Sequence, residues 1–539
     1  MMIHGIDLAI VVASLLALVL FAGWIARRQR TTEDYYLGGR QLPAWALGAS
    51  LAANQVSAIS LVGAPAFVAL REGGGLRWLQ YELAVPLALA ALVVWGVPVL
   101  RRAGGADVYA AVESRLGTGA RRTLAAFFLM GRGLGGGVIL YTSSLVVDAL
   151  TGWGIPASLS VVAAVSVAYT TLGGLVADVV SDVLQLGLLW AGTAVATVVL
   201  ALQLGGEGPV LDGVDPSRLV PLDLAGHGLG DGATFAFWPM LFGGLFLYMS
   251  YYGCDQTQAQ RILAAPSPGA ARRALVFAAL IRFPLVLTYC FFGVLLAALL
   301  VADPAFAGSL DGLPPDALVP RFLATRVPAG VLGIAAAGIL AAALSSLDSA
   351  LNSLSAVTLE EFFPRVARRG DRRSLLWARA GTVAWGAWAG ITGWWFSQAG
   401  ETVIELVNRV GSVVYGPILA LFLLTWRSSR ADGRSAVTGA LAGVAVNLAL
   451  AQFLPSVSWL WWNPIGCGVT LAVGHAAGRR QTQRGDARHD DAGRPDAHRQ
   501  PLPPMEAVEG RRDAQTLGLI LVMEFVLIVI GLSLLPLLV

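Results

Sequence analysis

The sequence predicts a helical membrane protein that crosses the bilayer many times. Of its 539 residues, 56% are hydrophobic and only 13% are charged, whereas a typical soluble domain has about 25% charged residues. The charges gather in short stretches between apolar runs of about 18 residues or more, each long enough to cross a hydrocarbon core of about 30 Å. This composition excludes an ordinary soluble protein.

Fourteen apolar runs predict fourteen transmembrane helices. They cover residues 5–26, 41–70, 78–100, 123–150, 155–172, 181–203, 233–256, 274–301, 330–356, 375–397, 402–426, 436–454, 458–478 and 516–538. The first run is followed, not preceded, by arginines, namely Arg27, Arg28 and Arg30. Because this charge order is the reverse of that in a signal peptide, we expect a retained helix whose N-terminus lies outside.

The basic residues support this topology. All 37 are arginines, and with an external N-terminus most of them fall in cytoplasmic segments, as the positive-inside rule requires. An even number of crossings then also places the C-terminus outside. We expect a multi-pass protein of the cell (cytoplasmic) membrane, and the small, unevenly spread net charge of +3 argues against a nucleic-acid partner.

Polar residues interrupt the second and seventh runs at matching places. The interruptions are residues 50–57, SLAANQVS, and residues 250–260, SYYGCDQTQAQ. Polar groups at this depth are costly unless they face protein or a water-filled cavity. The matched pair indicates two five-helix repeats, each beginning with a discontinuous helix whose ends bind ion and substrate. The alternative is that these side chains only join neighbouring helices.

The repeats divide the chain into six segments. We expect an extra N-terminal helix over residues 1–30, the first five-helix repeat over 31–205 and the second over 206–430. Two peripheral helices follow over 431–478, and a C-terminal helix covers 515–539. Residues 479–514 between them are rich in Arg, Asp, Gly and Pro and predict a disordered cytoplasmic linker.

A third interruption lies in the ninth run, at residues 341–349, AAALSSLDS. At helical spacing Ser345, Asp348 and Ser349 lie on one face. Neutral oxygens with one or two carboxylates suit a hard monovalent cation, whereas Zn²⁺ or copper would require His or Cys. A proton pathway through the carboxylate is the competing interpretation.

Four stretches together carry a family resemblance. They are residues 36–40, YLGGR; residues 171–174, TLGG, with 181–185, SDVLQ; residues 255–256, 260–261 and 264–265, reading DQ, QR and AA; and residues 345–352, SSLDSALN. In this order they resemble the solute:sodium symporter family, whose fold is the LeuT-like inverted repeat. The resemblance implies five plus five core helices, with one extra helix at the N-terminus and three at the C-terminus, and Na⁺ as the coupling ion.

The resemblance also implies the sodium ligands. The main site falls on the carbonyls of Ala53, Val56 and Ala342 and the hydroxyls of Ser345 and Ser346. A possible second cation site, known in some members, falls on Asp182, Ser345, Asp348 and Ser349. The chain departs from the two-sodium members at Asp348, where they have a serine. This extra carboxylate strengthens a second cation site, replaces it with a protonated group, or pairs with an arginine.

A substrate pocket is implied between the two broken helices. Its expected lining residues are Gln55, Ser57, Ser60, Tyr252, Asp255 and Gln256. Asp255 stands where sugar- and iodide-carrying relatives usually have Asn, whereas Tyr81 and Glu82 resemble the Tyr-Glu pair of the sugar branch. Sugar, monocarboxylate and amino acid therefore all remain open as solutes.

Two arginines inside the apolar runs need partners. Arg132 is a candidate for binding a substrate carboxylate, and the alternative is a structural partner for Asp348, Asp255 or a phosphate headgroup. Arg282 is expected to be structural or to snorkel toward the membrane surface.

These features predict a sodium-coupled symporter that imports a small polar organic solute by alternating access. No nucleophile and base constellation indicates an enzyme, and the G-x-G-x-x-G pattern at 131–136 lies in an apolar helix with no strand before it. A proton-coupled transporter using Asp182 and Asp348 is one alternative, and a solute sensor without transport is another. The expected partners are Na⁺, the solute and the lipid bilayer, and the sequence gives no oligomeric state.

Overall fold

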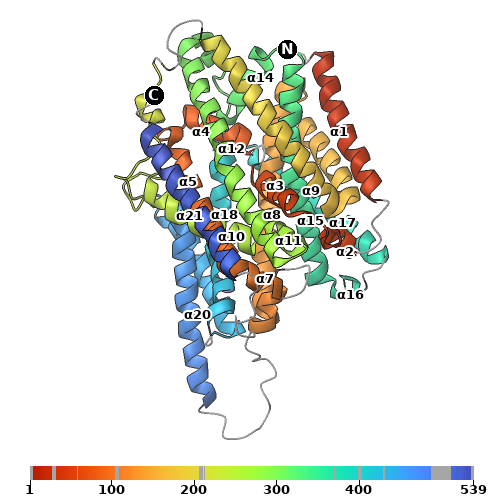
Figure 1. The fold of residues 1–539 in the computed structure, drawn as a ribbon, viewed down its shortest axis with the longest axis vertical. Helices are drawn as coiled ribbons and strands as arrows, with labels where there is room; N and C mark the ends of the chain where they lie inside the picture. The colour runs from red at the N-terminus through yellow and green to blue at the C-terminus, as the bar shows by residue number, and fades with distance from the viewer. Residues whose placement is uncertain are drawn as a thin grey trace.

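The structure is a computed structural model that describes residues 4–26, 32–56, 59–102, 108–205, 211, 213–367, 369, 372–398, 403–428, 431–486 and 511–535. Across these ranges the chain is almost entirely helical, and the only β pairing is an isolated bridge between Leu229 and Val457. The long helices stand side by side in one bundle, and the chain begins and ends at the same end of it (Figure 1). The predicted all-helical fold is confirmed.

The first half of the chain forms nine α-helices. They are α1 (Gly5–Ala26), α2 (Thr32–Leu37), α3 (Ala44–Gln55), α4 (Ala64–Leu70), α5 (Leu79–Glu82), α6 (Ala84–Ala91), α7 (Val97–Arg102), α8 (Ala110–Thr151) and α9 (Ile155–Leu204). Short 3₁₀ or π turns join them at η1 (Gly38–Arg40), η2 (Ile59–Gly63), η3 (Gly75–Trp78) and η4 (Leu92–Gly96). The segments η2 and α4 continue α3 as a bent pair of helices, whereas η3 to α7 form one helical span over Gly75–Arg101.

The second half forms twelve more α-helices. They are α10 (Gly244–Cys254), α11 (Gln256–Ala264), α12 (Pro268–Ala302), α13 (Pro304–Gly308), α14 (Leu318–Arg326), α15 (Val331–Phe362), α16 (Pro364–Ala367), α17 (Arg372–Phe396), α18 (Val403–Arg427), α19 (Gly433–Phe453), α20 (Trp462–Asp486) and α21 (Arg511–Leu534). The short turns η5 (Pro216–Leu219), η6 (Pro239–Gly243), η7 (Pro315–Ala317) and η8 (Trp459–Trp461) complete the described elements.

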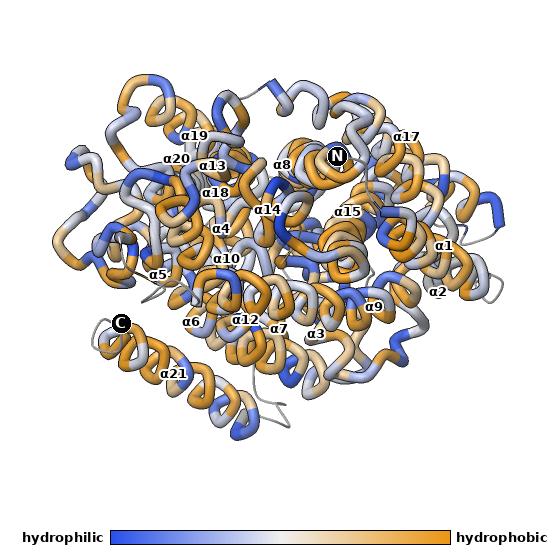
Figure 2. The backbone as a smooth tube through the Cα atoms, turned by 90° about the horizontal axis from the view of Figure 1, so that it is seen from above, coloured by the Kyte–Doolittle hydropathy of each residue, from blue (hydrophilic) through white to orange (hydrophobic). Residues whose placement is uncertain are grey.

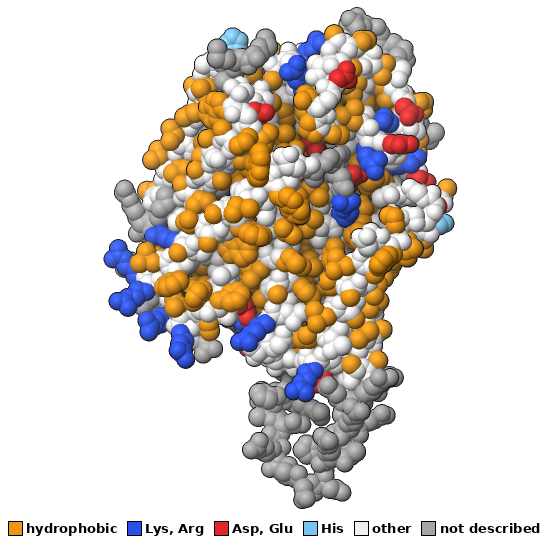
Figure 3. Space-filling view, turned by 180° about the vertical axis from the view of Figure 1, so that it is seen from behind, with side chains coloured by type: hydrophobic (Ala, Val, Ile, Leu, Met, Phe, Trp, Pro, Cys, Tyr) orange, Lys and Arg blue, Asp and Glu red, His pale blue; other side chains and the backbone are white. Residues whose placement is uncertain are grey.

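Length and apolar composition agree with a multi-pass membrane protein. Within the described ranges, nine helices are long and apolar enough to cross a bilayer, or ten if the bent pair Ala44–Gln55 and Ile59–Leu70 counts as one span. The remaining predicted runs lie on helices that are shorter, broken or more polar, so the count of fourteen crossings stays a prediction. Hydrophobic side chains cover most of the visible face, with a row of arginines along its lower edge (Figure 3).

Both predicted helix breaks are present. The chain bends by 52° between α3 and the helical segment that begins at Ile59. The second break lies at Asp255, whose extended backbone (φ −79°, ψ 126°) ends α10, and whose side chain accepts a hydrogen bond from the Thr257 amide at 2.8 Å. Such a side-chain cap fixes the start of α11. Helix termini with exposed carbonyl and amide groups therefore lie inside the bundle.

Element α9 contains the two helices that the sequence predicts at 155–172 and 181–203. A kink at Gly174, where φ is 59° and ψ is −171°, separates them, and the second helix begins at this glycine. A left-handed φ of this kind favours glycine because it has no Cβ. The second helix begins earlier than expected because Asp178, which breaks the apolar pattern, is buried against protein and not exposed to lipid.

Peripheral helices surround this core. Figure 2 shows α21 beside α6 and α12, at the edge of the bundle, with α1 on a different side near α9 and α15. Helix α20 continues to Asp486, so the predicted linker begins later than residue 479. Residues 487–510 of that linker lie outside the described ranges. The segment boundaries otherwise stay predictions.

Helix α15 lies in the centre of the bundle, packed on α9, α8, α3 and α17. The most apolar part of this helix is 89% buried inside the protein. The polar residues of its 345–353 segment therefore face other helices and not lipid, which is the condition for tolerating them at this depth.

Candidate ion and solute sites

The end of α3 and the middle of α15 meet at a polar contact. The Ser346 hydroxyl donates a hydrogen bond of 3.0 Å to the carbonyl of Asn54, in the last turn of α3. Helix carbonyls in a last turn have no further amide above them, so they can accept bonds from other groups. Ala53, Val56 and Ala342, whose carbonyls are predicted sodium ligands, are all buried in the same region.

This contact has the chemistry of a sodium site and not of a transition-metal site. Its groups are neutral hydroxyl and carbonyl oxygens, which suit a hard monovalent cation. In the part of the chain that the structure describes, no cluster of three or more His, Cys, Asp or Glu residues could hold a metal ion. The neighbouring hydroxyl, Ser345, donates to the carboxylate of Asp182.

Behind these serines lies a buried charge cluster built on Arg261. Its Nη2 donates to Asp178 Oδ2 at 2.8 Å, to Asp182 Oδ2 at 3.0 Å and to Ser349 Oγ at 2.6 Å. Its Nε donates to Ser50 Oγ at 2.6 Å, and Ser50 in turn donates to Asp182. The guanidinium has no exposed surface, and it joins α3, α9, α11 and α15.

Sequence reasoning did not identify Asp178 and Arg261 as site residues. The available signal was their spacing and placement: Asp178 lies four residues before Asp182, on the same face of a helix, and Arg261 lies within a segment that is otherwise apolar or uncharged. Pairing the two required the three-dimensional arrangement, because 83 positions separate Arg261 from Asp178.

Asp348 is separated from this cluster in its bonding. Its Oδ1 accepts a hydrogen bond of 2.7 Å from Thr170, at the turn in α9, and its Oδ2 has no partner among the described residues. Its predicted neighbour Ser349 bonds instead to Asp178 and Arg261. Of the predicted pairings, the one between Asp348 and an arginine is therefore absent from the described contacts.

A cavity of about 100 Å³ lies between the two broken helices. It is lined by Asn54, Gln55, Ile59, Ser60, Trp78, Tyr81, Arg132, Ile139, Leu247, Tyr248, Tyr251, Arg282, Tyr289, Ser346, Ile404, Val407, Asn408 and Tyr415. Three predicted pocket residues, Gln55, Ser60 and Arg132, are among them, and Ser346, a predicted sodium ligand, forms part of its wall. The predicted pocket residue Ser57 lies outside the described residues.

The other predicted pocket residues lie behind this wall. Gln256 uses its Oε1 to accept the Val108 amide at 3.0 Å, toward the end of the bundle where α8 begins. The ring of Tyr252 packs edge-on against Tyr251, with 5.4 Å between the ring centroids, and the Tyr252 hydroxyl has no described partner. Asp255 lines a much smaller adjoining hollow.

Arg132 connects that hollow to the cavity. Its Nε donates to Asp255 Oδ2 at 2.8 Å, and its Cζ lies 4.7 Å from the centroid of the Tyr251 ring. Its Nη2 is buried without a partner among the described residues. The structural pairing with Asp255 is therefore present, and the guanidinium still has one free donor beside the cavity.

A second buried ion pair lies on another wall. Arg282 bonds Glu82 through both Nε and Nη2, each at 2.8 Å, while Tyr248 lies 3.4 Å from the same carboxylate. Arg282 is 4% exposed, so of the two roles expected for it, structural or snorkelling, its contacts agree with the structural one. Its Nη1 is also buried with no described partner. Both oxygens of Glu82, which resembles the Glu of the sugar branch's Tyr-Glu pair, accept hydrogen bonds from Arg282.

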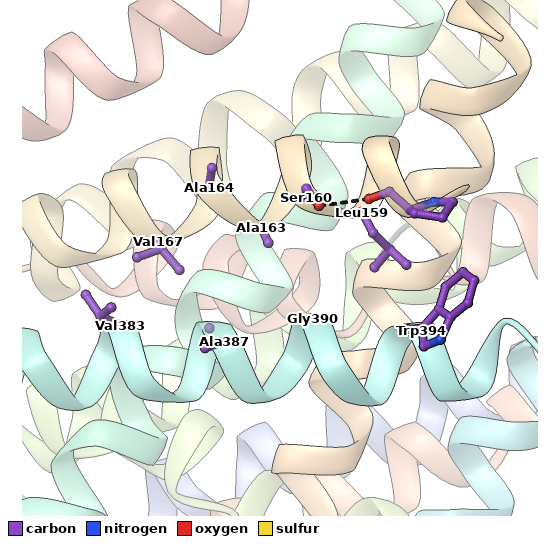
Figure 4. A pocket seen from close by; sticks show the side chains of 11 residues that line it. Leu159, Ser160, Ala163, Ala164, Val167, Val383, Ala387, Gly390 and Trp394 are labelled. Carbon is purple, nitrogen blue, oxygen red and sulfur yellow. Dashed lines mark hydrogen bonds between the residues drawn. The ribbon is translucent and has the colours of Figure 1, made fainter. Parts of the chain in front are cut away.

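A hollow larger than this cavity lies elsewhere and is a poor match for a polar solute. It is an apolar groove of about 450 Å³ between α9 and α17, lined by residues such as Ala163, Val167 and Trp394 (Figure 4). Its one hydroxyl, Ser160, donates to the Pro156 carbonyl of its own helix at 2.8 Å. Its lining carries no charged side chain, and besides Ser160 only the Trp394 indole is polar, so it offers few groups to orient a polar solute.

Two contacts hold the beginning of α18. The guanidinium of Arg71, just after α4, bonds Glu405 at 2.7 Å. Asp316, in η7, accepts a hydrogen bond from the Val403 amide at 2.9 Å. Burial, opposed by that hydrogen bond, raises the pKa of the Asp316 carboxyl to about 7. The first turn of α18 carries Ile404 and Val407 to the cavity wall.

The chain is similar to known sodium-coupled transporters. The sequence profile described as "Sodium:solute symporter family" matches residues 35–443. A putative sodium-dependent multivitamin transporter of Drosophila melanogaster is 27% identical over 481 residues, which cover 86% of this chain and 77% of that protein. Sodium-coupled monocarboxylate transporter 1 of Homo sapiens is 27% identical over 443 residues, covering 80% and 70%.

A solved structure has the same fold. It is the substrate-bound outward-open state of a Na⁺-coupled sialic acid symporter, with a TM-score of 0.78 and 21% sequence identity, covering 88% of this chain and 98% of that one. The agreement in fold extends over nearly the whole of the solved protein.

Proposed function

This chain belongs to the sodium:solute symporter family, and from that premise we propose that it couples the entry of Na⁺ to the uptake of a small polar organic solute by alternating access. The matched relatives are transporters whose names carry sodium dependence. Na⁺ is accordingly the coupling ion. The proposed function, sodium-coupled transport, is therefore of the same class as that of the relatives.

The observation that carries the proposal is the contact between Ser346 and the Asn54 carbonyl, 3.0 Å long. It brings a pair of serine hydroxyls on α15 to the open end of α3. We assign the main Na⁺ ligands there, as the carbonyls of Ala53, Val56 and Ala342 and the hydroxyls of Ser345 and Ser346. A cation so placed replaces direct contacts between the two helices by ligand bonds to both.

This position couples the ion to the solute. Ser346 and Asn54 are both part of the cavity wall, so an ion held by this region fixes the shape of the wall before the solute arrives. A ligand shifts a conformational equilibrium only by binding one state more tightly than the other. Na⁺ stabilises the state in which α3 and α15 are joined, and its release to the cytoplasm loosens that wall and frees the solute.

We propose that the solute carries a carboxylate. Arg132 is paired with one carboxylate, Asp255, but keeps a buried Nη2 without a described partner. A buried donor without a partner costs free energy, about 1 to 3 kcal/mol, and a carboxylate of the solute would satisfy it. Relatives named for monocarboxylates and sialic acid are consistent with this class.

A sugar is a poorer fit. In the sugar branch the Glu that corresponds to Glu82 is expected to accept a sugar hydroxyl, but here both of its oxygens accept from Arg282. Glu82 is also not among the residues that line the cavity, so a hydroxyl of a solute there does not reach its carboxylate directly. The six aromatic rings of the cavity wall, from Trp78, Tyr81, Tyr248, Tyr251, Tyr289 and Tyr415, instead suit an apolar body behind the carboxylate.

We further assign the protein to the cell membrane with both termini outside. The chain begins and ends at one end of the bundle (Figure 1), and the arginine-rich segments between the helices then fall mostly on the cytoplasmic side. Reactivity of an engineered external tag in intact cells tests this orientation.

A thermal-shift screen of the purified full-length protein tests the proposal. Small carboxylates, sugars and amino acids are compared in Na⁺ and in an equal concentration of choline. The expected result is that one or more carboxylates raise the melting temperature, and that they do so only with Na⁺. Stabilisation by a sugar instead would overturn the solute class, and stabilisation that ignores Na⁺ would overturn the coupling.

A further inference from the structure

We propose that the guanidinium of Arg261 stands as a fixed positive charge in the place of a second sodium ion, so that each chain binds a single Na⁺. This inference rests on the proposed main sodium site and goes beyond it, because it sets the number of ions. The family resemblance allowed a second site on Asp182, Ser345, Asp348 and Ser349. The contacts of those residues disagree with it.

The oxygens of that second site are already in use. Both oxygens of Asp182 accept hydrogen bonds, one from Ser345 and the other from Ser50 and Arg261. Ser349 accepts from Arg261 Nη2 at 2.6 Å and donates to Asp178 at 2.9 Å. A cation at this point would have to displace the guanidinium, which is itself a cation with five donors in a rigid fork.

Asp348 does not complete the ligand set either. Its Oδ1 is turned to the Thr170 hydroxyl at 2.7 Å, in the first helix of α9. The carboxylate that distinguishes this chain from two-sodium members is therefore bonded outside the Arg261 cluster, and its Oδ2 has no partner among the described residues. What is left beside Arg261 is a closed network of hydrogen bonds and ion pairs.

The two carboxylates beside Arg261 explain why its guanidinium occupies this position in place of Na⁺. Asp178 and Asp182 lie on one face of α9, 5% and 0% exposed, and Arg261 bonds both with a fully buried side chain. Removing one member of a buried ion pair leaves an uncompensated charge inside the protein, which is strongly destabilising. A free Na⁺ must leave water to enter such a site, whereas the tethered guanidinium is always present.

The arrangement also predicts what the fixed charge does. It joins α3, α9 and α11 to α15 whether or not Na⁺ is bound. Only the contact between α3 and α15 near Ser346 then depends on the ion. One Na⁺, and no more, controls the wall of the cavity.

Equilibrium binding of ²²Na⁺ to the purified full-length protein tests the inference without a known solute. The expected result is one Na⁺ bound per chain. Two Na⁺ per chain would overturn the inference and leave the proposed symport intact, whereas no bound Na⁺ would overturn the proposed function itself.

A variant sharpens the test. Arg261→Gln keeps hydrogen-bonding capacity and removes the charge, so two carboxylates and the serine hydroxyls become available to a cation, and bound Na⁺ is expected to double. Arg272→Gln is the matched control, because Arg272 is another buried arginine whose Nε donates to the Val93 carbonyl at 3.3 Å, away from the cluster. It is expected to keep one Na⁺.

One outcome would contradict the claim that Arg261 excludes a second Na⁺. If Arg261→Gln protein elutes as a single species, still binds Na⁺ at the main site and gains no second ion, the arginine is not what excludes it. If the variant fails to fold, the count of ions on the unaltered protein still decides the question.

Discussion

The hydroxyl of Ser346 on α15 lies 3.0 Å from the Asn54 carbonyl at the end of α3 and donates a hydrogen bond to it. The contact joins two helices whose residues lie 292 positions apart in the chain. One of these helices is broken just beyond the contact, and the other is the most buried of the described helices that are long and apolar enough to cross a bilayer. An ion bound at this contact would therefore act between a broken helix and a helix in the core of the bundle.

Ser346→Ala is expected to raise the Na⁺ concentration for half-maximal uptake by about five- to thirtyfold, since losing one oxygen ligand costs about 1 to 2 kcal/mol. Uptake of the solute found in the screen, measured at increasing Na⁺, gives this value. Ser355→Ala is the matched control, because Ser355 lies on the same helix and bonds the Ala378 carbonyl. An unchanged Na⁺ dependence in Ser346→Ala would remove this residue from the site.

The ion pair between Glu82 and Arg282 is expected to be needed for stability. Glu82→Gln leaves a buried guanidinium without its counter-charge, which lowers the free energy of unfolding by about 3 to 5 kcal/mol. The melting temperature of the purified variant measures this loss.

A double-mutant cycle measures the interaction between Glu82 and Arg282 separately from the effect of changing either side chain alone. In Glu82→Gln/Arg282→Met both charges are gone, so the double variant is expected to be more stable than Glu82→Gln alone. If the double variant loses as much free energy of unfolding as Glu82→Gln and Arg282→Met lose together, the two side chains do not act as a pair.

Arg132→Gln is expected to weaken binding of a carboxylate solute. A hydrogen bond to a charged group contributes about 1.5 to 3 kcal/mol, so the half-saturating solute concentration should rise by about ten- to a hundredfold. Na⁺ binding in the absence of solute serves as the control and should be unchanged. Equal solute affinity in the variant and the unaltered protein would refute the carboxylate assignment to Arg132.

Asp316 is expected to make stability depend on pH. Its pKa in the folded protein is raised to about 7 from an ordinary value of 3.8, so the folded state holds the proton more tightly than the unfolded state. Its contribution is greatest below about pH 4 and is lost as the pH rises to about 7, with a slope of about 1.4 kcal/mol per pH unit inside that window.

Asp316→Asn removes this titration and should flatten the melting temperature between pH 5 and pH 7, which are chosen to lie within the window. Asp215→Asn is the control: the Ser217 hydroxyl and amide lower the pKa of this exposed carboxyl, so it does not titrate there. A slope that survives in Asp316→Asn would assign the pH dependence to another group.

Much of the fold could be predicted because the signals are local. An apolar run of sufficient length must be a helix in a bilayer, since only internal hydrogen bonds satisfy its backbone. Polar clusters at Ser50 and Asp255 marked both helix breaks for the same reason. The two predicted helices of α9 are present on either side of Gly174, but the second begins before residue 181 because Asp178, which breaks the apolar pattern, is buried.

The ion pairs could not be predicted, because no local signal links their members. Glu82 and Arg282 lie 200 positions apart. In the sequence, each of them could equally line a pocket or extend to the membrane surface. The same holds for Arg261 with Asp178. The sequence identified charged residues within the membrane as important, but only the packing of α9, α11 and α15 decides which charges neutralise each other.

The central claim is tested most directly by uptake into proteoliposomes that contain the purified full-length protein. A labelled carboxylate identified by the screen is added under an inward Na⁺ gradient, under an inward proton gradient without Na⁺, and under neither. The account predicts accumulation above the equilibrium level with the Na⁺ gradient alone. Accumulation driven by the proton gradient in the absence of Na⁺, or none under the Na⁺ gradient, would contradict it.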